Sequence, residues 1–436
     1  MKISFFKKVI SPEVGVRLSG YRMEDFSLSK LDDLFMTGLL VDDGERKVLL
    51  ISLDLLCLNE AFIRKVRAKC GEILGVPEYH VMLTTTHTHG GPQVNTEPLF
   101  DDHVEWAYLD DLEQAILEEC RKLPERLVEA NAFSYSMKMD ENKNRRVVMA
   151  DNYACYLPHR AELRRIADGF VDQELGNLFF VAKGQDFPTY VVGNYAAHPL
   201  AGHSVGTGGR RISADFPTYF REYVKQECGA ECMYVSGAIG DMIPKEDELG
   251  ADAAKQLGTR LAKGILRGML DATRNPERFK MQSQKVGAFS RKISVPFRPS
   301  YRNNPEMLPS HYLDKDTVDL ELQCIAIGDV CFVGVPGEFC AELGAEIKWH
   351  SPFRKAYIAF GATAYHEYFC PANFLLQGGY EAERHHFSPR YSLELVKTAV
   401  DAMRELHDSL YPLGDTEEDF QTLRNQVTIK STKMTP

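Results

Sequence analysis

Short apolar runs alternate along the chain with longer segments in which apolar residues recur at helical spacing. Apolar runs of strand length lie at 47–54, 190–197, 232–236 and 330–339. Helical periodicity predicts helices at 59–75, 108–123, 215–223, 251–272 and 392–410. Asn59 and Asp215 stand at N-cap positions, and Gly75 stands at a helix stop. Strands that alternate with helices predict an α/β fold, a mixed β-sheet core with flanking helices.

The pattern changes after residue 272. Alternation over 285–298 predicts a strand, and the Asn- and Pro-rich segment 299–309 predicts a loop. Segment 318–339 adds two further strands. Because 414–436 is polar, we expect one domain over residues 1–413 and a loosely packed tail over 414–436.

His87 and His89 are the most informative polar residues, in the segment 86–92 that follows the apolar run 79–83. Residues i and i+2 of a strand share a face, so we expect both imidazoles to face one cavity while Thr88 points away. The Gly-Gly-Pro sequence at 90–92 is expected to end the strand. The alternative is a polar strand end at which backbone carbonyls satisfy each ring, since two neighbouring ligands do not complete a metal site.

Two further metal-compatible side chains follow predicted strands. His198 comes after the run 190–197, and Glu338 lies near the end of the run 330–339. The carboxyl ends of strands are where α/β sheets assemble their sites. His87, His198 and Glu338 therefore make a His/His/Glu set that suits zinc with an open fourth position, and iron or manganese also accepts such ligands.

Five segments in fixed order carry a resemblance to a known family. They are T-H-T-H-G-G-P at 86–92, N-Y-A-A-H-P at 194–199, G-D-M-I-P at 240–244, V-P-G-E-F at 335–339 and Y-H-E-Y at 365–368. Together they resemble the zinc-dependent amidase domain of the neutral/alkaline non-lysosomal ceramidases. The resemblance spans most of the chain and implies a ceramidase-like catalytic domain over residues 1–413.

The resemblance implies a set of metal ligands, namely His87, His198, Glu338 and Tyr368. It implies catalytic or polar contact for His89 and Arg145, and substrate contact for Arg145 and Tyr365. Alternatively, His89 is a third nitrogen ligand or a hydrogen-bond partner of a ligand. Asp241 is counted with the candidate catalytic residues, and it is either an acceptor that orients a ligand or a loop residue.

Ile243 is a departure from the family pattern, which has serine at this position. Either that serine is not the essential nucleophile, or the substrate differs, or this protein binds metal without turnover. A dication lowers the pKa of a bound water and polarises a carbonyl, so the remaining residues favour a metal-activated water. Ile243 is then expected to line the substrate cavity.

A further group of polar residues is either pocket wall or ordinary surface. It comprises Asp101, Asp102, His103, His385, His386, Glu381 and Arg384. The last two belong to a Y-E-A-E-R stretch that resembles one in the family, and a helix start with paired charges explains them equally well.

Composition sets limits on the class of protein. A net charge of -11 over 436 residues argues against a nucleic-acid or anionic-membrane surface. No apolar run reaches the roughly 20 residues of a membrane span, and the N-terminus has no signal-like apolar region, so we expect a cytoplasmic protein without a transmembrane segment. The ten cysteines are scattered and contain no C-x-x-C pair, which favours reduced core thiols.

The sequence thus predicts a zinc-dependent hydrolase, with Zn²⁺ as cofactor, that cleaves the linear carbon–nitrogen amide bond of a small-molecule N-acyl substrate. The family carries a further C-terminal domain that we do not expect here, and short or polar N-acyl compounds are expected to outrank ceramide. A zinc esterase or lactonase and a non-catalytic zinc-binding protein are the alternatives. Whether the chain forms a homo-oligomer is left open.

Overall fold

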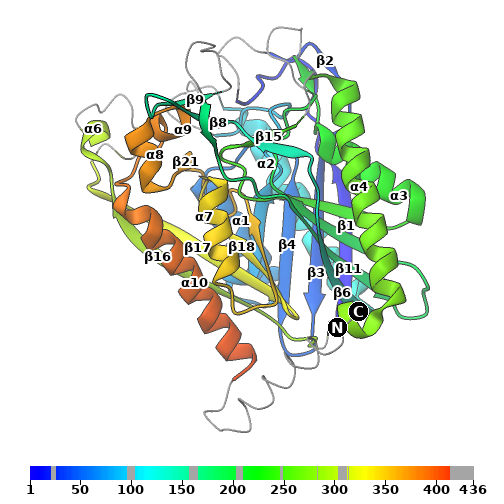
Figure 1. The fold of residues 1–436 in the computed structure, drawn as a ribbon. Helices are drawn as coiled ribbons and strands as arrows, with labels where there is room; N and C mark the ends of the chain where they lie inside the picture. The colour runs from blue at the N-terminus through cyan, green and yellow to red at the C-terminus, as the bar shows by residue number, and fades with distance from the viewer. Residues whose placement is uncertain are drawn as a thin grey trace, which may run out of the picture.

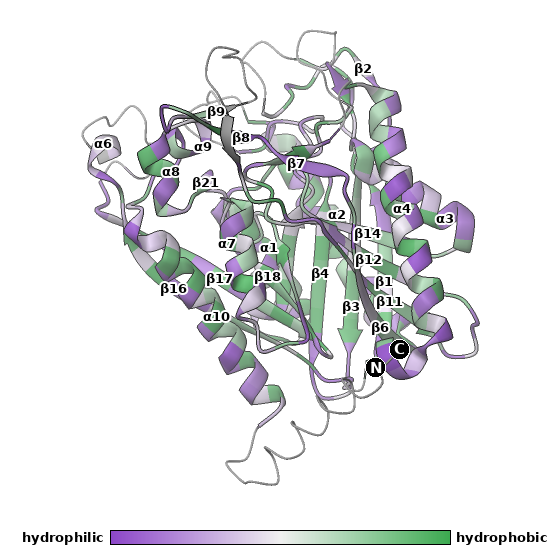
Figure 2. Ribbon diagram, in the orientation of Figure 1, coloured by the Kyte–Doolittle hydropathy of each residue, from purple (hydrophilic) through white to green (hydrophobic). Residues whose placement is uncertain are grey.

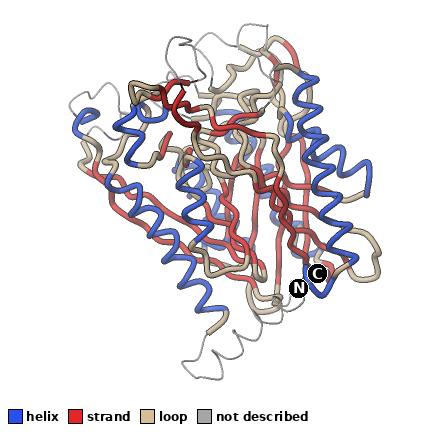
Figure 3. The backbone as a smooth tube through the Cα atoms, in the orientation of Figure 1, coloured by secondary structure: helices blue, strands red, loops and turns tan. Residues whose placement is uncertain are grey.

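The structure, a computed structural model, describes residues 1–20, 26–95, 104–156, 165–202, 210–245, 249–281, 283–302, 312 and 314–412. Within them, two large mixed sheets form the centre and helices lie outside (Figures 1 and 3). The larger sheet holds, in spatial order, β14 (Glu231–Ser236), β12 (Tyr190–Tyr195), β11 (Glu174–Ala182), β6 (Val128–Lys138), β1 (Lys2–Val9), β3 (Phe35–Asp42), β4 (Lys47–Leu53) and β5 (Val81–Thr85). The smaller sheet holds β16 (Val286–Pro296), β17 (Thr317–Ile327), β18 (Val330–Gly334) and β20 (Lys355–Ala359). The predicted α/β fold with a mixed sheet core is confirmed.

The larger sheet is joined in its middle by a short contact, in which Lys2 pairs with Glu129 and Ile3 with Val128. Apolar side chains from both halves of this sheet and from the smaller sheet pack into one cluster, to which Leu50 of β4, Phe180 of β11 and Phe332 of β18 belong. The main core therefore lies between three sheet surfaces.

Helices cover the outer faces of these surfaces. The half with β3, β4 and β5 packs against α1 (Glu60–Leu74) and α2 (Trp106–Lys122), and the half with β6, β11, β12 and β14 packs against α3 (Phe216–Cys228) and α4 (Ala251–Arg274). The smaller sheet packs against α7 (Ala341–Trp349) and α10 (Arg390–Leu410). Figure 2 shows the alternating hydrophobic and hydrophilic stripes of α4 and α10 that this one-sided packing requires.

Strands covered on both faces explain the nearly continuous apolar runs in the sequence. Leu39 and Leu50 point into the shared core, whereas their neighbours Leu40 and Ile51 pack on the side of α1 and α2. Successive residues of a strand face opposite ways, so both parities are apolar when both faces are buried. Within the described residues, no helix is long and apolar enough to span a membrane.

Helix boundaries follow the local signals in the sequence. The Asn59 side chain accepts a hydrogen bond from Phe62 N at 2.8 Å, and α1 ends at Gly75 with φ 68°. Asp215 caps α3 by accepting from Phe216 N at 2.6 Å. These predictions are confirmed, because caps depend on residues next to each other in sequence.

Several predicted boundaries need correction. The run 330–339 is not one strand: β18 ends at Gly334, and Gly337 with φ 155° separates it from β19 (Glu338–Phe339). Residues 78–80 form a 3-10 turn before β5, and the predicted loop 299–309 begins with the short helix α6 (Pro299–Arg302). Residues 303–309 and the predicted tail 414–436 lie outside the described residues.

Candidate metal centre

His87 lies beyond the end of β5, not on it. β5 ends at Thr85, and His87 has a left-handed backbone with φ 66°, which is uncommon for a residue with a side chain. Its amide bonds to Leu55 O at 2.9 Å, so the backbone has left the strand ladder. The prediction that His87 and His89 share a strand face is therefore wrong, although the loop brings their ring centroids within 5.2 Å.

The His87 ring is oriented by a backbone carbonyl. Nδ1 lies 2.9 Å from Leu56 O, and a carbonyl can only accept, so Nδ1 carries the proton of the neutral ring. Burial lowers the pKa of His87 to about 4, with the nearby Glu338 carboxylate acting in the opposite direction. At neutral pH Nε2 therefore presents a lone pair to the site.

His198 repeats this arrangement three residues after β12. Its Nδ1 lies 2.9 Å from Met242 O, and its backbone amide donates to the same carbonyl at 3.0 Å. Met242 begins β15 (Met242–Pro244), which pairs with β7 (Asn142–Asn144). This contact turns Nε2 of His198 toward the Glu338 carboxylate and toward the ring of His87, whose centroid lies 4.9 Å away.

Glu338 supplies the carboxylate. It begins β19, which pairs in parallel with β21 (Tyr368–Phe369), and its amide bonds to Glu367 O at 2.8 Å. Oε1 lies 3.5 Å from His87 Nε2, and Oε2 lies 3.1 Å from His198 Nε2. Within the described residues, Oε2 accepts no hydrogen bond.

In the neutral tautomers that the two carbonyls favour, these contacts bring two imidazole lone pairs close to one carboxylate. His87, His198 and Glu338 are each 1% exposed, so bulk water does not screen their electrostatic interactions. Two imidazole lone pairs and a carboxylate repel one another unless a proton or a metal cation lies between them. The donor set of two nitrogens and a carboxylate fits zinc, iron or manganese.

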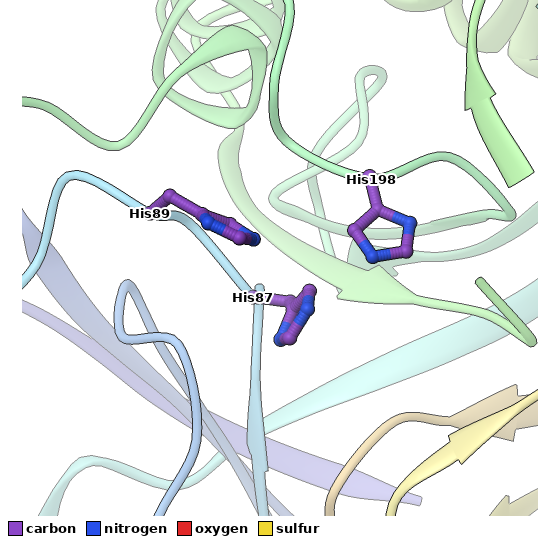
Figure 4. A group of neighbouring side chains, drawn as sticks. All are labelled: His87, His89 and His198. Carbon is purple, nitrogen blue, oxygen red and sulfur yellow. The ribbon is translucent and has the colours of Figure 1, made fainter. Parts of the chain in front are cut away.

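His89 faces the same space (Figure 4). One ligand atom each from His87, His89 and His198 lies within 4.8 Å of the others, a spacing that could hold a metal ion. Gly20 packs on the other side: a Cβ built at Gly20, whose φ is 82°, would lie 2.3 Å from His89 Nδ1. Because Gly20 has no side chain, the His89 ring can occupy this position without a clash.

Tyr368 and Arg145 form the next part of the site. Arg145, 3% exposed, donates from Nη2 to Tyr368 Oη at 3.0 Å and from Nε to Glu381 Oε1 at 2.5 Å. Burial raises the pKa of Tyr368 well above its usual value, and the Glu338 charge adds to this effect. The phenol is therefore neutral unless a cation favours its ionised form.

Glu381 joins two arginines, because its other oxygen lies 3.1 Å from Nη1 of Arg146. The sequence favoured a helix start with paired charges and a site role equally for Glu381, and the structure shows the helix start and the paired charges. It lies in the short helix α9 (Tyr380–Glu383), and it is 1% exposed. The pairing could not be predicted, since Arg145 and Glu381 are far apart in sequence.

Tyr365 contacts Glu338. Its hydroxyl donates to Glu338 Oε1 at 2.6 Å, and its side chain is 5% exposed. The expected substrate contact is untested, and the contact that the structure shows orients a carboxylate.

Asp241 and Ile243 flank the carbonyl that holds His198. The Asp241 carboxylate accepts from Ala341 N at 2.8 Å and from Asn144 Nδ2 at 2.6 Å. These contacts tie β7 to the start of α7, so Asp241 positions the backbone on which Arg145 lies. Ile243 is 8% exposed and is not among the residues of the described apolar clusters.

His385 and His386 are buried, not surface residues. His385 Nδ1 donates to Tyr368 O at 3.0 Å, and His386 Nε2 lies 3.1 Å from Glu367. Arg384 also pairs with Glu367, which has a left-handed backbone with φ 58°. His385 thus contacts the backbone of Tyr368 directly, and Arg384 and His386 hold Glu367, whose carbonyl accepts from the backbone amide of Glu338. Asp101, Asp102 and His103 lie outside the described residues.

Comparison with known proteins identifies the fold of this chain. No family model and no curated protein matches the sequence. A solved ceramidase complexed with C2 matches with a TM-score of 0.75, and the neutral ceramidase from Pseudomonas aeruginosa matches with 0.72. Both are 16% identical, and the matches cover 94% and 93% of this chain and 75% of theirs.

The chain has the neutral ceramidase fold. The resemblance that the five sequence segments indicated is thereby confirmed at the level of the fold. The neutral ceramidase fold extends over both sheets, and His87, His198 and Glu338 come together from three separate parts of it.

Proposed function

We propose that this chain is a metal-dependent hydrolase that cleaves a carbon–nitrogen amide bond of an N-acyl compound, with zinc as the metal. The observation that carries the proposal is that His87 Nε2 lies 3.5 Å and His198 Nε2 lies 3.1 Å from the two oxygens of the buried Glu338 carboxylate, while Nδ1 of each ring is turned to a backbone carbonyl. The likeness to solved ceramidases supports amide hydrolysis as the reaction class.

His87, His198 and Glu338 would hold the ion, with Tyr368 as a fourth ligand. A bound dication supplies polarisation of a carbonyl and a lowered pKa for a water molecule. Arg145 holds the Tyr368 hydroxyl at 3.0 Å, and Tyr365 holds one oxygen of Glu338 at 2.6 Å. These contacts fix the directions of two ligands before substrate arrives.

His89 has the position of a proton donor. Its ring lies across the site from His198, with centroids 6.3 Å apart. An imidazole there can donate to the oxyanion of a tetrahedral intermediate or pass a proton to the leaving amine. Ile243 has no ionisable group, so we assign the nucleophile to water and not to a side chain at that position.

The test combines metal content with turnover. Full-length protein purified without added metal should contain about one zinc per chain and hydrolyse a member of a panel of N-acyl amino acids, N-acyl amino alcohols and ceramides. His198→Ala should lose both metal and turnover. His80→Ala is the matched control, because His80 Nδ1 also bonds to a backbone carbonyl, Lys47 O, but at the start of β5.

Two outcomes would contradict the proposal. Equal metal content in the wild-type and His198→Ala proteins would rule out a metal site at His198. Metal-replete protein without amide turnover over the whole panel would leave a metal-binding protein that is not an amidase.

A further inference from the structure

Two buried cysteines lie beside the metal centre. Sγ of Cys340 is 3.6 Å from Sγ of Cys370, and both residues are 0% exposed. Each follows a proposed metal ligand at the same spacing, Cys340 two residues after Glu338 and Cys370 two residues after Tyr368. The thiols therefore mark the point at which the two ligand-bearing strands end.

The strand register makes the two cysteines direct partners. Glu338 pairs with Tyr368 and Phe339 with Phe369, so Cys340 and Cys370 are the next pair in the same parallel register. Cys340 N also donates to Phe369 O at 3.0 Å, which extends the pairing by one residue. Neighbouring strands lie about 4.8 Å apart, within the Cα separation of roughly 4.4–6.8 Å that disulfides need.

The remaining sulfur movement is small. A disulfide bond is about 2.05 Å long, and side-chain rotation can bring sulfurs from contact distance to bonding distance when the backbones are already placed. The Cys370 side chain is also held, because its thiol donates to Glu381 O at 3.3 Å. Glu381 in turn pairs with Arg145, so the cysteine pair is continuous with the site.

We propose that Cys340 and Cys370, which the sequence analysis expected to be reduced like the other cysteines, are a modification site at which a disulfide bond cross-links the ends of β19 and β21 under oxidising conditions. The two thiols are oxidised, one sulfur–sulfur bond forms, and the two electrons and two protons pass to a low-molecular-weight disulfide such as oxidised glutathione. The bond in that oxidant breaks and yields two thiols. Because both cysteines are wholly buried, the bond closes during folding, before the helices cover them.

The cross-link fixes the register that places Glu338 next to Tyr368. A slip of one residue between parallel strands would turn one of these side chains to the opposite face. The bond should therefore slow the loss of metal from the site. This effect on metal rests on the proposed function, whereas the bond itself does not.

The experiment refolds the reduced full-length chain with zinc in a glutathione redox buffer, and in parallel with excess thiol. Free thiols are then alkylated under denaturing conditions and the peptides are mapped by mass spectrometry. We expect a linked peptide pair containing Cys340 and Cys370 in the oxidised sample only. Cys340→Ala should abolish it, and Cys232→Ala, another buried thiol, should not.

Mapping of full-length chain secreted into an oxidising compartment gives the same information without a refolding step. Cys340 and Cys370 both alkylated in the oxidised samples would overturn the proposal. Transfer of zinc to a chelator should be several-fold slower from the oxidised than from the reduced protein. Equal rates, with the linked peptide present, would overturn the effect on the site while the metal content still supports the proposed function.

Discussion

The hydroxyl of Tyr365 lies 2.6 Å from Oε1 of Glu338, the same oxygen that lies 3.5 Å from Nε2 of His87. Oε2, which faces His198, has no such donor among the described residues. The two carboxylate oxygens are thus unequal. A tyrosine hydroxyl donates to one oxygen, and the other lies 3.1 Å from His198 Nε2.

Tyr365→Phe should weaken metal binding without unfolding the protein. The change removes one hydroxyl and keeps the ring, and loss of a hydrogen bond to a metal ligand typically lowers metal affinity or activity by about 10–100-fold. Competition with a metal-binding dye measures the affinity. Tyr312→Phe is a suitable control, since its hydroxyl bonds to His366 instead. Unchanged affinity in Tyr365→Phe would show that Glu338 is oriented by other contacts.

His89→Ala should lower turnover more than it lowers metal content. One lost donor to an oxyanion typically costs on the order of 100-fold in turnover. Steady-state rates and elemental analysis on the same preparation separate the two effects. A variant that loses its metal would instead make His89 a third nitrogen ligand, consistent with its place among the three clustered histidines.

Ile243→Ser should be tolerated by the fold. Ile243 is buried but stands outside the described apolar clusters, so we expect the free energy of unfolding to fall by about 1 kcal/mol, less than the roughly 2–5 kcal/mol of a core truncation. Ile265 lies on α4 and belongs to the apolar cluster that this helix buries, so Ile265→Ser should show the larger loss of unfolding free energy. Urea titration measures both. Equal losses of unfolding free energy in the two variants would show that Ile243 is a core residue and does not line the proposed substrate cavity.

Asp32 should make stability depend on pH. Burial raises its pKa from 3.8 to about 7, although Ser213 Oγ and Ala214 N donate to it. The folded state then binds a proton more tightly than the unfolded state, so this contribution is present below the unfolded pKa and is lost as pH rises through about 7.

Asp32→Asn should therefore flatten the fall in unfolding free energy between pH ~5 and pH ~8, measured by urea titration. Asp33→Asn is the control with the opposite sign. Hydrogen bonds from Lys30 and Ser11 lower the Asp33 pKa, so its contribution is lost only towards acid pH. An unchanged slope in Asp32→Asn would assign the pH dependence to other groups.

Local signals in the sequence predicted much of this fold. Asn59, Gly75 and Asp215 act through neighbours in the chain, and the helix boundaries that depend on them agree with the structure. The prediction of a strand through His87 was wrong, because there contacts with residues distant in the sequence decide the backbone conformation. Thr86 N bonds to Leu53 O and His87 N to Leu55 O, and these contacts override the strand preference of the run.

The sequence indicated residues of the candidate site, but not the residues that hold them in position. His198 and Glu338 could be chosen because each follows an apolar run that the structure shows as a strand. The ion pairs of Glu381 and Glu367 could not, since charged residues in a sequence do not reveal distant partners. The cytoplasmic location and the assignment of residues 1–413 to one domain stay predictions.

The proposed metal ligands follow strands in both halves of the larger sheet and in the smaller sheet, with His87 after β5, His198 after β12 and Glu338 after β18. An ion held by all of them would close the chain over long separations, as a cross-link does. Its free concentration would then set the thermal midpoint by mass action. Chelation should raise amide hydrogen exchange at the carboxyl ends of β5, β12 and β18 together, although these strands belong to different parts of the sheet system.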